Sequence, residues 1–418
     1  MSAATSARSS SSSPAQARPA TYREIFAVAE FRALFAGSLM YGLGFTFEVL
    51  GLSVLVYAQT RSAFLSAFAF SMGFAPQVVG GALFTALADR LPPRTVITAG
   101  LLLRALPGLL IGALPSMPVA VMLVIVAAAA SITPVFSAAI SGLLPDVLER
   151  DRYVLGRSAL SLLSSGTQIL GLGLAGLILA VMSARGLLLA AGLALVLSAL
   201  IRRGVRPRPA RAAGPISVRG TIRATVAGNA RLFRDPRIRG LLLAQWLPIA
   251  ASSGGESLVV PYIGSTGRAA SAAGPLLATL PIGMMAGTWL VGRFCRPATR
   301  QQLALPLALL TGLPWLVFLF HPPLWVLAIA LFVCGCGFAY ELTIQQQFLD
   351  SVPGELRGQA FGLNSTGLMS GQGFTPWLSG AFAGILGPAG AMAAAGGAGI
   401  ASSLALYRSL SGRGTRRR

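Results

Sequence analysis

Four ionisable side chains lie inside long apolar stretches of the chain: Glu48, Arg104, Glu256 and Glu341. If these stretches cross a bilayer, a charge near its centre costs ~2.5–3.5 kcal/mol on insertion scales and marks a candidate functional site. A desolvated carboxyl can hold a proton at neutral pH and release it when water reaches it. The three carboxylates are therefore candidates for proton coupling or for binding a cationic substrate, and we expect Glu48 to carry the coupled proton.

Arg104 calls for a different interpretation. An arginine at mid-depth needs an anionic partner, and Glu48 is the carboxylate at the best matching depth. We therefore interpret Arg104 as one member of a structural ion pair. The same pairing could give Glu48 a structural role instead of a coupling role, and the sequence leaves both alternatives open.

Aromatic and amide side chains add a second type of candidate. Such groups can stack on, and hydrogen-bond to, a large amphipathic ligand within an apolar cavity. Five occur at positions that we expect to line a cavity: Tyr41, Gln245, Trp246, Tyr340 and Asn364.

Residue types that serve catalysis or metal binding are scarce and scattered. The chain has one histidine, His321, and three cysteines, and none of the cysteines has a histidine nearby in sequence. The spacing fits neither a nucleophile with its base nor a set of metal ligands. We expect no catalytic residue, no metal and no cofactor, and therefore no enzyme.

The elements that position these residues must be membrane helices. The chain is 54% hydrophobic and 11% charged, whereas about a quarter of the residues of a soluble domain are charged. About 20 apolar residues cross a bilayer as a helix, which satisfies its own backbone hydrogen bonds. Twelve runs of that length occur, near 33–57, 64–87, 95–114, 118–143, 157–181, 186–201, 240–262, 270–291, 303–320, 324–347, 359–385 and 387–407.

The basic residues, all of them arginine, indicate the orientation of these spans. Alternate loops and both terminal segments carry 29 arginines, and the opposite side carries three: Arg61, Arg185 and Arg268. Basic residues concentrate on the cytoplasmic side of membrane proteins. We expect a multi-pass protein of the plasma (inner) membrane with both termini cytoplasmic. The net charge of +21 then reflects topology, and we expect no nucleic-acid partner.

Charge and composition divide the chain into five parts. We expect a disordered cytoplasmic segment over 1–31, six-helix bundles over 32–201 and 240–407, a cytoplasmic linker over 202–239 and a basic cytoplasmic tail over 408–418. The linker places Ile222, Val226, Ala230 and Phe233 on one face of a predicted amphipathic helix. Such a helix can bind anionic lipid headgroups, although a solvated helix is the alternative.

The two bundles resemble each other in sequence. Glu48 matches Glu256, and Thr85 and Arg90 match Thr288 and Arg293, at an offset of 203–208 residues. Duplicated halves are typical of alternating-access transporters, which place the substrate near mid-membrane between the repeats. The fold class predicted is an all-α membrane protein with twelve transmembrane helices in two pseudo-symmetric bundles, with Glu48 and Glu256 facing one cavity from opposite walls.

The segment DRLPPR at 89–94 resembles the signature loop of the major facilitator superfamily, with Asp89, Arg90 and Arg94 in matching positions. The resemblance implies that these three residues form a cytoplasmic gate, with Asp89 near Gly358. The segments LLPDVLERDR at 143–152 and VPGELRG at 352–358 look like the macrolide-efflux and siderophore-exporter branch of drug:proton antiporters. The chain departs from the antiporter signature over 171–176, where a proline and a glycine are missing.

This resemblance implies a monomeric secondary active transporter, an antiporter that exports a hydrophobic or amphipathic small molecule in exchange for protons. Efflux of a drug, an antibiotic or a siderophore-like compound would fit. The alternative is a facilitator or importer of a polar solute without proton coupling. The expected partners are the small-molecule substrate, protons and anionic membrane lipids.

Overall fold

The computed structural model describes residues 21–88, 91–209 and 218–406, and every regular element within these ranges is a helix. In the first half these are α1 (Tyr22–Ala27), α2 (Ala29–Thr60), α3 (Ala63–Ser71), α4 (Ala75–Ala88), α5 (Pro93–Ala113), α6 (Val119–Ala130), α7 (Thr133–Val147), α8 (Arg150–Val181) and α9 (Ala184–Arg202).

The linker forms α10 (Val218–Arg234). In the second half the helices are α11 (Pro236–Glu256), α12 (Val259–Ser265), η1 (Ala270–Ala272), α13 (Ala273–Phe294), α14 (Pro297–Leu310), η2 (Leu313–Phe320), α15 (Leu324–Gly337), η3 (Phe338–Tyr340), α16 (Glu341–Ser351), η4 (Gly354–Leu356) and α17 (Arg357–Ala405).

Several helix ends follow from local sequence. The helix α2 ends where Arg61 adopts a left-handed conformation, and the next residue, Ser62, accepts a hydrogen bond from the Leu65 backbone N–H to begin α3. Asp235 caps α11 in the same way, and Ser183 caps α9. Such caps satisfy backbone donors that a helix leaves free at its first turn.

The observed helices account for the predicted spans. In the described part of the chain, ten helical stretches are long and apolar enough to cross a membrane. One of them, α17, is two helices joined at Gly387, whose φ of 71° is favourable only for glycine. The predicted span 240–262 corresponds to α11 and α12 together.

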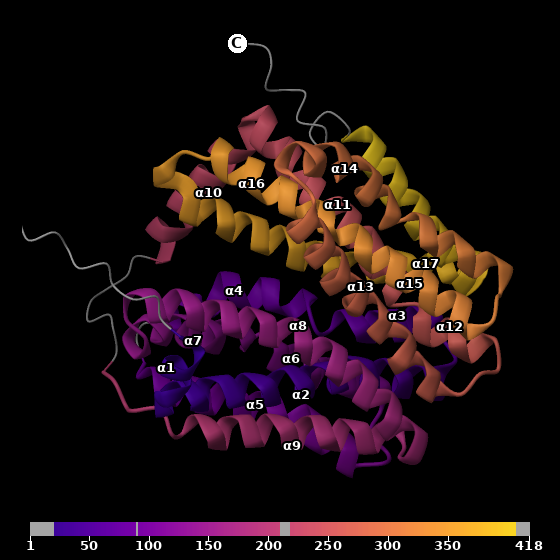
Figure 1. Cartoon of the computed structure of the whole chain (residues 1–418). Helices are drawn as coiled ribbons and strands as arrows, with labels where there is room; N and C mark the ends of the chain where they lie inside the picture. The colour runs from indigo at the N-terminus through magenta and orange to yellow at the C-terminus, as the bar shows by residue number, and fades with distance from the viewer. Residues whose placement is uncertain (1–20, 89–90, 210–217, 407–418) are drawn as a thin grey trace, which may run out of the picture.

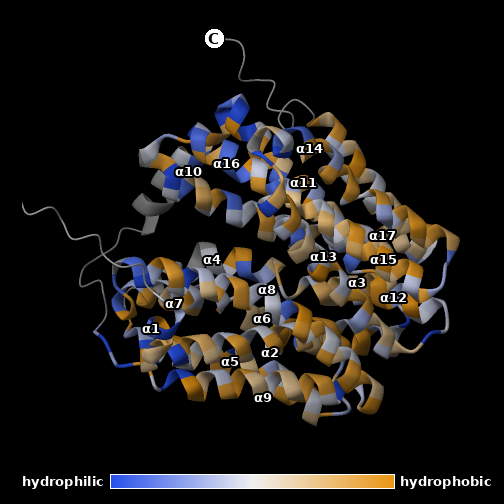
Figure 2. Ribbon diagram, in the orientation of Figure 1, coloured by the Kyte–Doolittle hydropathy of each residue, from blue (hydrophilic) through white to orange (hydrophobic). Residues whose placement is uncertain are grey.

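The two halves lie one against the other (Figure 1), with α2 to α9 in one half and α11 to α17 in the other. We call the end where α2 begins and α9 stops the terminal end, and the end where α2 meets α3 the far end. The ribbons of the halves converge at the far end and diverge toward the terminal end. Apolar residues cover most of the helices, and hydrophilic residues gather at the terminal end and in the loops (Figure 2).

Small residues allow close packing of the halves at the far end. A Cβ on Gly274 of α13 would lie 2.5 Å from the carbonyl oxygen of Leu172 in α8, and Gly176 of α8 packs directly on Pro275. The indole N–H of Trp377 in α17 donates to the Ser71 hydroxyl of α3 at 2.5 Å. Backbones approach this closely only where side chains are absent, so the far end is the closed end of the structure.

The structure differs from the expected disorder of the segment 1–31 in its last part. Residues 22–27 form α1 and α2 begins at Ala29, because Ile25 and Phe31 are fully buried against the first half. The rest of that segment, and the tail 408–418, lie outside the described ranges.

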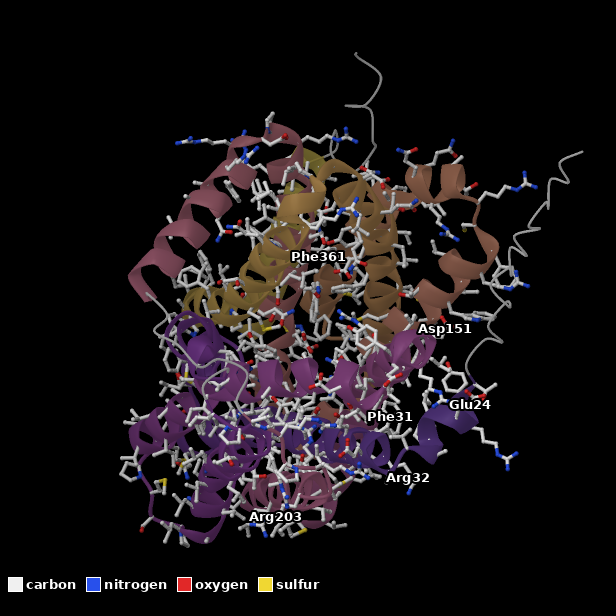
Figure 3. The ribbon with its side chains drawn as sticks, turned by 90° about the vertical axis from the view of Figure 1, so that its left-hand side faces the viewer. Glu24, Phe31, Arg32, Asp151, Arg203 and Phe361 are labelled. Atoms are coloured by element: carbon white, nitrogen blue, oxygen red, sulfur yellow. The ribbon has the colours of Figure 1, made fainter. Side chains whose placement is uncertain are left out.

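Viewed from the terminal end, Glu24 and Asp151 lie near each other at the rim of the first half, and Phe361 belongs to the second half (Figure 3).

The linker helix α10 rests on the second half. Leu232 is buried, the Phe233 ring stacks on Trp246 with centroids 5.9 Å apart, and the Gln359 side chain donates to the Asn229 carboxamide oxygen at 3.1 Å. Part of the face predicted to meet lipid therefore meets protein, whereas Val226 remains exposed. Lipid binding by this helix stays a prediction.

Candidate functional site

A cavity of about 610 Å³ lies between the halves. Its walls come mainly from α2, α7 and α8 of the first half, and three residues from the second half close it: Glu256, Leu277 and Met369. The first half contributes Ser38, Tyr41, Gly42, Phe45, Thr46, Val49, Leu50, Phe70, Phe74, Gln77, Phe136, Ser137, Ile140, Ser141, Leu160, Leu163, Ser164, Thr167, Gln168, Leu172 and Arg202.

Aromatic rings form much of the apolar wall. Phe45 meets Phe74 edge to face with centroids 5.7 Å apart, and Tyr41 meets Phe136 in the same manner at 5.6 Å. Rings in this arrangement present both faces and edges to a bound group, and they favour apolar or aromatic ligands. The cavity is therefore suited to a ligand with a substantial apolar body.

The hydroxyl and amide groups in the wall are partly committed to their own helices. Thr46 donates to the Gly42 carbonyl at 2.9 Å, Thr167 donates to the Ser164 carbonyl at 2.9 Å, and the Gln77 amide donates to the carbonyl of Gly73. These bonds use both threonine hydroxyl protons and one of the two N–H donors of Gln77, so those donors are not free for a ligand. The wall consequently offers a polar ligand fewer donors than its composition suggests.

Glu256 is the carboxylate in this wall. It is the last residue of α11 and is half-buried. No hydrogen bond or ion pair to its side chain occurs among the described residues. An unpaired carboxyl in an apolar cavity is a candidate for exchanging protons or for meeting a cation.

Glu48 has a different environment. Both of its carboxylate oxygens lie 2.5 Å from Nη1 of Arg104, and both side chains are about 1% exposed. The described wall of the cavity contains Glu256 but not Glu48. The structure thus brings Glu48 and Arg104 together, and of the two repeat-related carboxylates only Glu256 faces the cavity in the described residues.

The amide and indole candidates of the second half form a cluster of their own. The Asn364 amide donates to Gln245 Oε1 at 3.0 Å, and the Trp246 indole N–H donates to Asn364 Oδ1 at 2.9 Å. Tyr340 is fully buried and donates to the Ala244 carbonyl at 3.0 Å. These bonds tie α11 to α17 and to η3, and within the described part of the chain none of the four residues lines the cavity.

Glu341 and the gate residues lie elsewhere. Glu341 is half-buried in the first turn of α16 and is not part of the cavity wall as described. Asp89 and Arg90 are outside the described residues, so their contact near Gly358 stays a prediction. Arg94 lies in the first turn of α5 and lines a small pocket beside Arg203.

Of the five aromatic and amide candidates, Tyr41 alone reaches the described cavity wall. The wall also holds Arg202, which the sequence suggested only as one of many arginines that set topology. Arg202 is 2% exposed, and its Nη2 donates to the Ser38 hydroxyl at 3.0 Å. The sequence showed that Arg202 lies in the last turn of an apolar span. It did not show where the side chain points, because the adjacent Arg203 has the same residue type and is exposed.

The chain was compared with curated proteins, solved structures and family models. No curated protein matches it. Among solved structures, a POT family transporter in complex with 5-aminolevulinic acid is 12% identical over 92% of this chain and 96% of its own, with a TM-score of 0.72. A single-residue mutant of the nucleoside transporter NupG is 12% identical over 91% of this chain and 99% of its own, also at 0.72.

A bacterial homologue of the human lysosomal transporter Spinster, in an inward-facing and unoccupied conformation, is 15% identical over 91% of this chain and 95% of its own, with a TM-score of 0.64. These likenesses confirm the predicted fold class, an all-α membrane protein of two six-helix bundles. The family model of the Major Facilitator Superfamily matches residues 34–355. The chain therefore belongs to the Major Facilitator Superfamily, a family of membrane transporters and not of enzymes.

Proposed function

We propose that this protein is a proton-coupled exporter of a hydrophobic or amphipathic small molecule, working by alternating access. The single observation that carries the proposal is a cavity of about 610 Å³ with aromatic walls and a carboxylate, Glu256, that has no partner among the described residues. The volume lies within the range of small-molecule sites, about 300–1,000 Å³. The likeness of the segment 143–152 to the macrolide-efflux branch also supports export.

Glu256 is the carboxylate that we assign to proton coupling. Glu48 already has a cation against both of its oxygens, so gaining or losing a proton there would break a buried ion pair. Glu256 has no such partner among the described residues, and it lies where the cavity wall is formed by the second half. A negative charge on Glu256 is unfavourable when the cavity is closed and is tolerated when water enters. Closing of the cavity therefore favours uptake of a proton by Glu256, and opening favours its release.

The import or facilitation of a polar solute is the competing function. A sugar-like ligand needs several free hydrogen-bond donors and acceptors, because each of its hydroxyls must be satisfied in the cavity. Thr46, Thr167 and one N–H of Gln77 donate to backbone carbonyls. In the rest of the described wall, phenylalanines and leucines outnumber the serines and Gln168. These observations favour the amphipathic substrate.

The test begins with a thermal-shift screen of purified protein against antibiotics, siderophores and aromatic dyes. A ligand at 100 times its Kd stabilises the folded state by ~2.7 kcal/mol. A compound that shifts unfolding is then offered to everted membrane vesicles with an acidic interior. We expect uphill accumulation that collapses when a protonophore removes the pH gradient. Accumulation that is unaffected by the protonophore, or that occurs only in right-side-out vesicles, would contradict proton-coupled export.

A further inference from the structure

Arg202 is a buried cation in the cavity wall whose charge is not matched by an acid among the described residues. Its side chain crosses α2 beside Gly37, where a Cβ would lie 2.7 Å from Cγ of Arg202. This glycine leaves room for the guanidinium to run from α9 toward the cavity. There, Nη2 donates to Ser38 Oγ at 3.0 Å, and Ser38 itself lines the cavity.

The other guanidinium nitrogens are unsatisfied. Among the described residues, Nε and Nη1 of Arg202 are buried without a hydrogen-bond partner. In the described part of the first half and the linker, the ion pairs of Glu48, Glu24 and Glu30 do not include Arg202. An uncompensated buried charge is strongly unfavourable, so a structural role alone does not account for this arginine.

From these observations we infer that Arg202 and Ser38 form the subsite for an anionic group, a carboxylate or a phosphate, of the transported molecule. The Ser38 hydroxyl accepts from Arg202 and can donate its own proton to the anion, while the guanidinium supplies the positive charge. Hydrogen bonds to charged groups are stronger than those between neutral groups. This inference rests on the proposed function, and it names the substrate class as an amphipathic anion.

The layout of the cavity fits such a molecule. Ser38 and Leu50 both line the cavity and lie twelve positions apart on α2, about 18 Å along a helix that rises 1.5 Å per residue. Between them the wall carries Tyr41, Phe45 and Val49. The anionic group would sit toward the terminal end, and the apolar body would extend along the aromatic wall toward the part of the cavity that Glu256 closes.

The experiment uses two probes that differ only in charge: dansyl-glycine, with a carboxylate, and dansyl-glycinamide, with a neutral amide. Each is titrated at about pH 7.5 against the full chain in phosphatidylcholine nanodiscs, with empty nanodiscs subtracted. We expect wild type to bind dansyl-glycine at least tenfold more tightly, a preference worth about 1.4 kcal/mol. Equal affinity for the two probes, or binding of neither, would overturn the inference without any variant.

Variants locate the preference. Arg202→Gln should lose it, and Arg203→Gln should keep it, because Arg203 is the adjacent residue with the same charge but an exposed side chain. Loss of the preference in Arg203→Gln, or its survival in Arg202→Gln, would place the anion elsewhere and refute the assignment.

A lipid headgroup could supply the same anionic oxygens. The titration is therefore repeated in nanodiscs that contain one-third phosphatidylglycerol. An unchanged preference supports a substrate anion, and its disappearance would show that a headgroup occupies Arg202 and would overturn the assignment to substrate. Because the binding needs no pH gradient, this test can fail while gradient-driven transport persists, and it can succeed in a protein that proves not to be proton-coupled.

Discussion

Replacing one partner of the Glu48–Arg104 pair should destabilise the protein far more than replacing both. Glu48→Leu leaves the Arg104 guanidinium buried, with its Nε and Nη2 already lacking partners among the described residues. Breaking a buried ion pair from one side costs about 3–5 kcal/mol, whereas replacing both members by apolar residues of similar size is often neutral. We therefore expect Glu48→Leu and Arg104→Met each to lose about 3–5 kcal/mol, and the double variant to recover most of that loss.

The unfolding of purified protein in one detergent, followed by tryptophan fluorescence, measures these differences. Wild type, both single variants and the double variant form a double-mutant cycle, which isolates the energy of the pair. Gradient-driven transport of the double variant is measured alongside, and we expect it to persist because the pair does not line the described cavity. The reasoning is refuted if the single variants unfold like wild type, or if the double variant is as unstable as the worse single one.

Gly176→Val should slow transport at least tenfold, because a side chain at this position meets Pro275 and prevents the halves from closing at the far end. Gly173→Val, three residues away with open space around it, should transport normally. Equal rates of tracer uptake in the two variants would contradict this prediction. Asn364→Ala should lower the free energy of unfolding by about 1–3 kcal/mol, since it leaves Gln245 Oε1 buried without its donor; unchanged chemical denaturation would count against it. A cysteine at Ser62 should react with an impermeant maleimide from outside intact cells and one at Ala298 only after permeabilisation, and the reverse pattern would invalidate the orientation.

The spans were predictable because lipid imposes a simple rule on them. Any helix that crosses a bilayer needs about 20 apolar residues, so all twelve runs could be read from composition, including the two separate runs that meet at Gly387 within α17. The pairing of Glu48 with Arg104 could be anticipated because a charge inside the bilayer costs free energy at both positions, and because both residues lay at similar depth. Depth follows from counting residues along a helix.

The faces of the helices were not predictable to the same degree. Gln245, Trp246 and Asn364 have the residue types of a binding site, yet they bond to one another between α11 and α17. Arg202 was grouped with the topology-setting arginines, yet its side chain lies in the cavity wall. The direction of a side chain depends on helix rotation and on small neighbours such as Gly37, and an apolar span carries little periodicity from which to read rotation.

The central claim, that Glu256 carries the coupled proton, is tested most directly by separating coupling from transport. Protein with Glu256→Gln is reconstituted beside wild type and Glu341→Gln, whose carboxyl lies outside the described cavity wall. Uphill accumulation of the screened substrate under a pH gradient is compared with its counterflow exchange without a gradient. We predict that Glu256→Gln loses uphill accumulation and keeps counterflow, while Glu341→Gln keeps both. Uphill accumulation at the wild-type rate in Glu256→Gln would contradict the account.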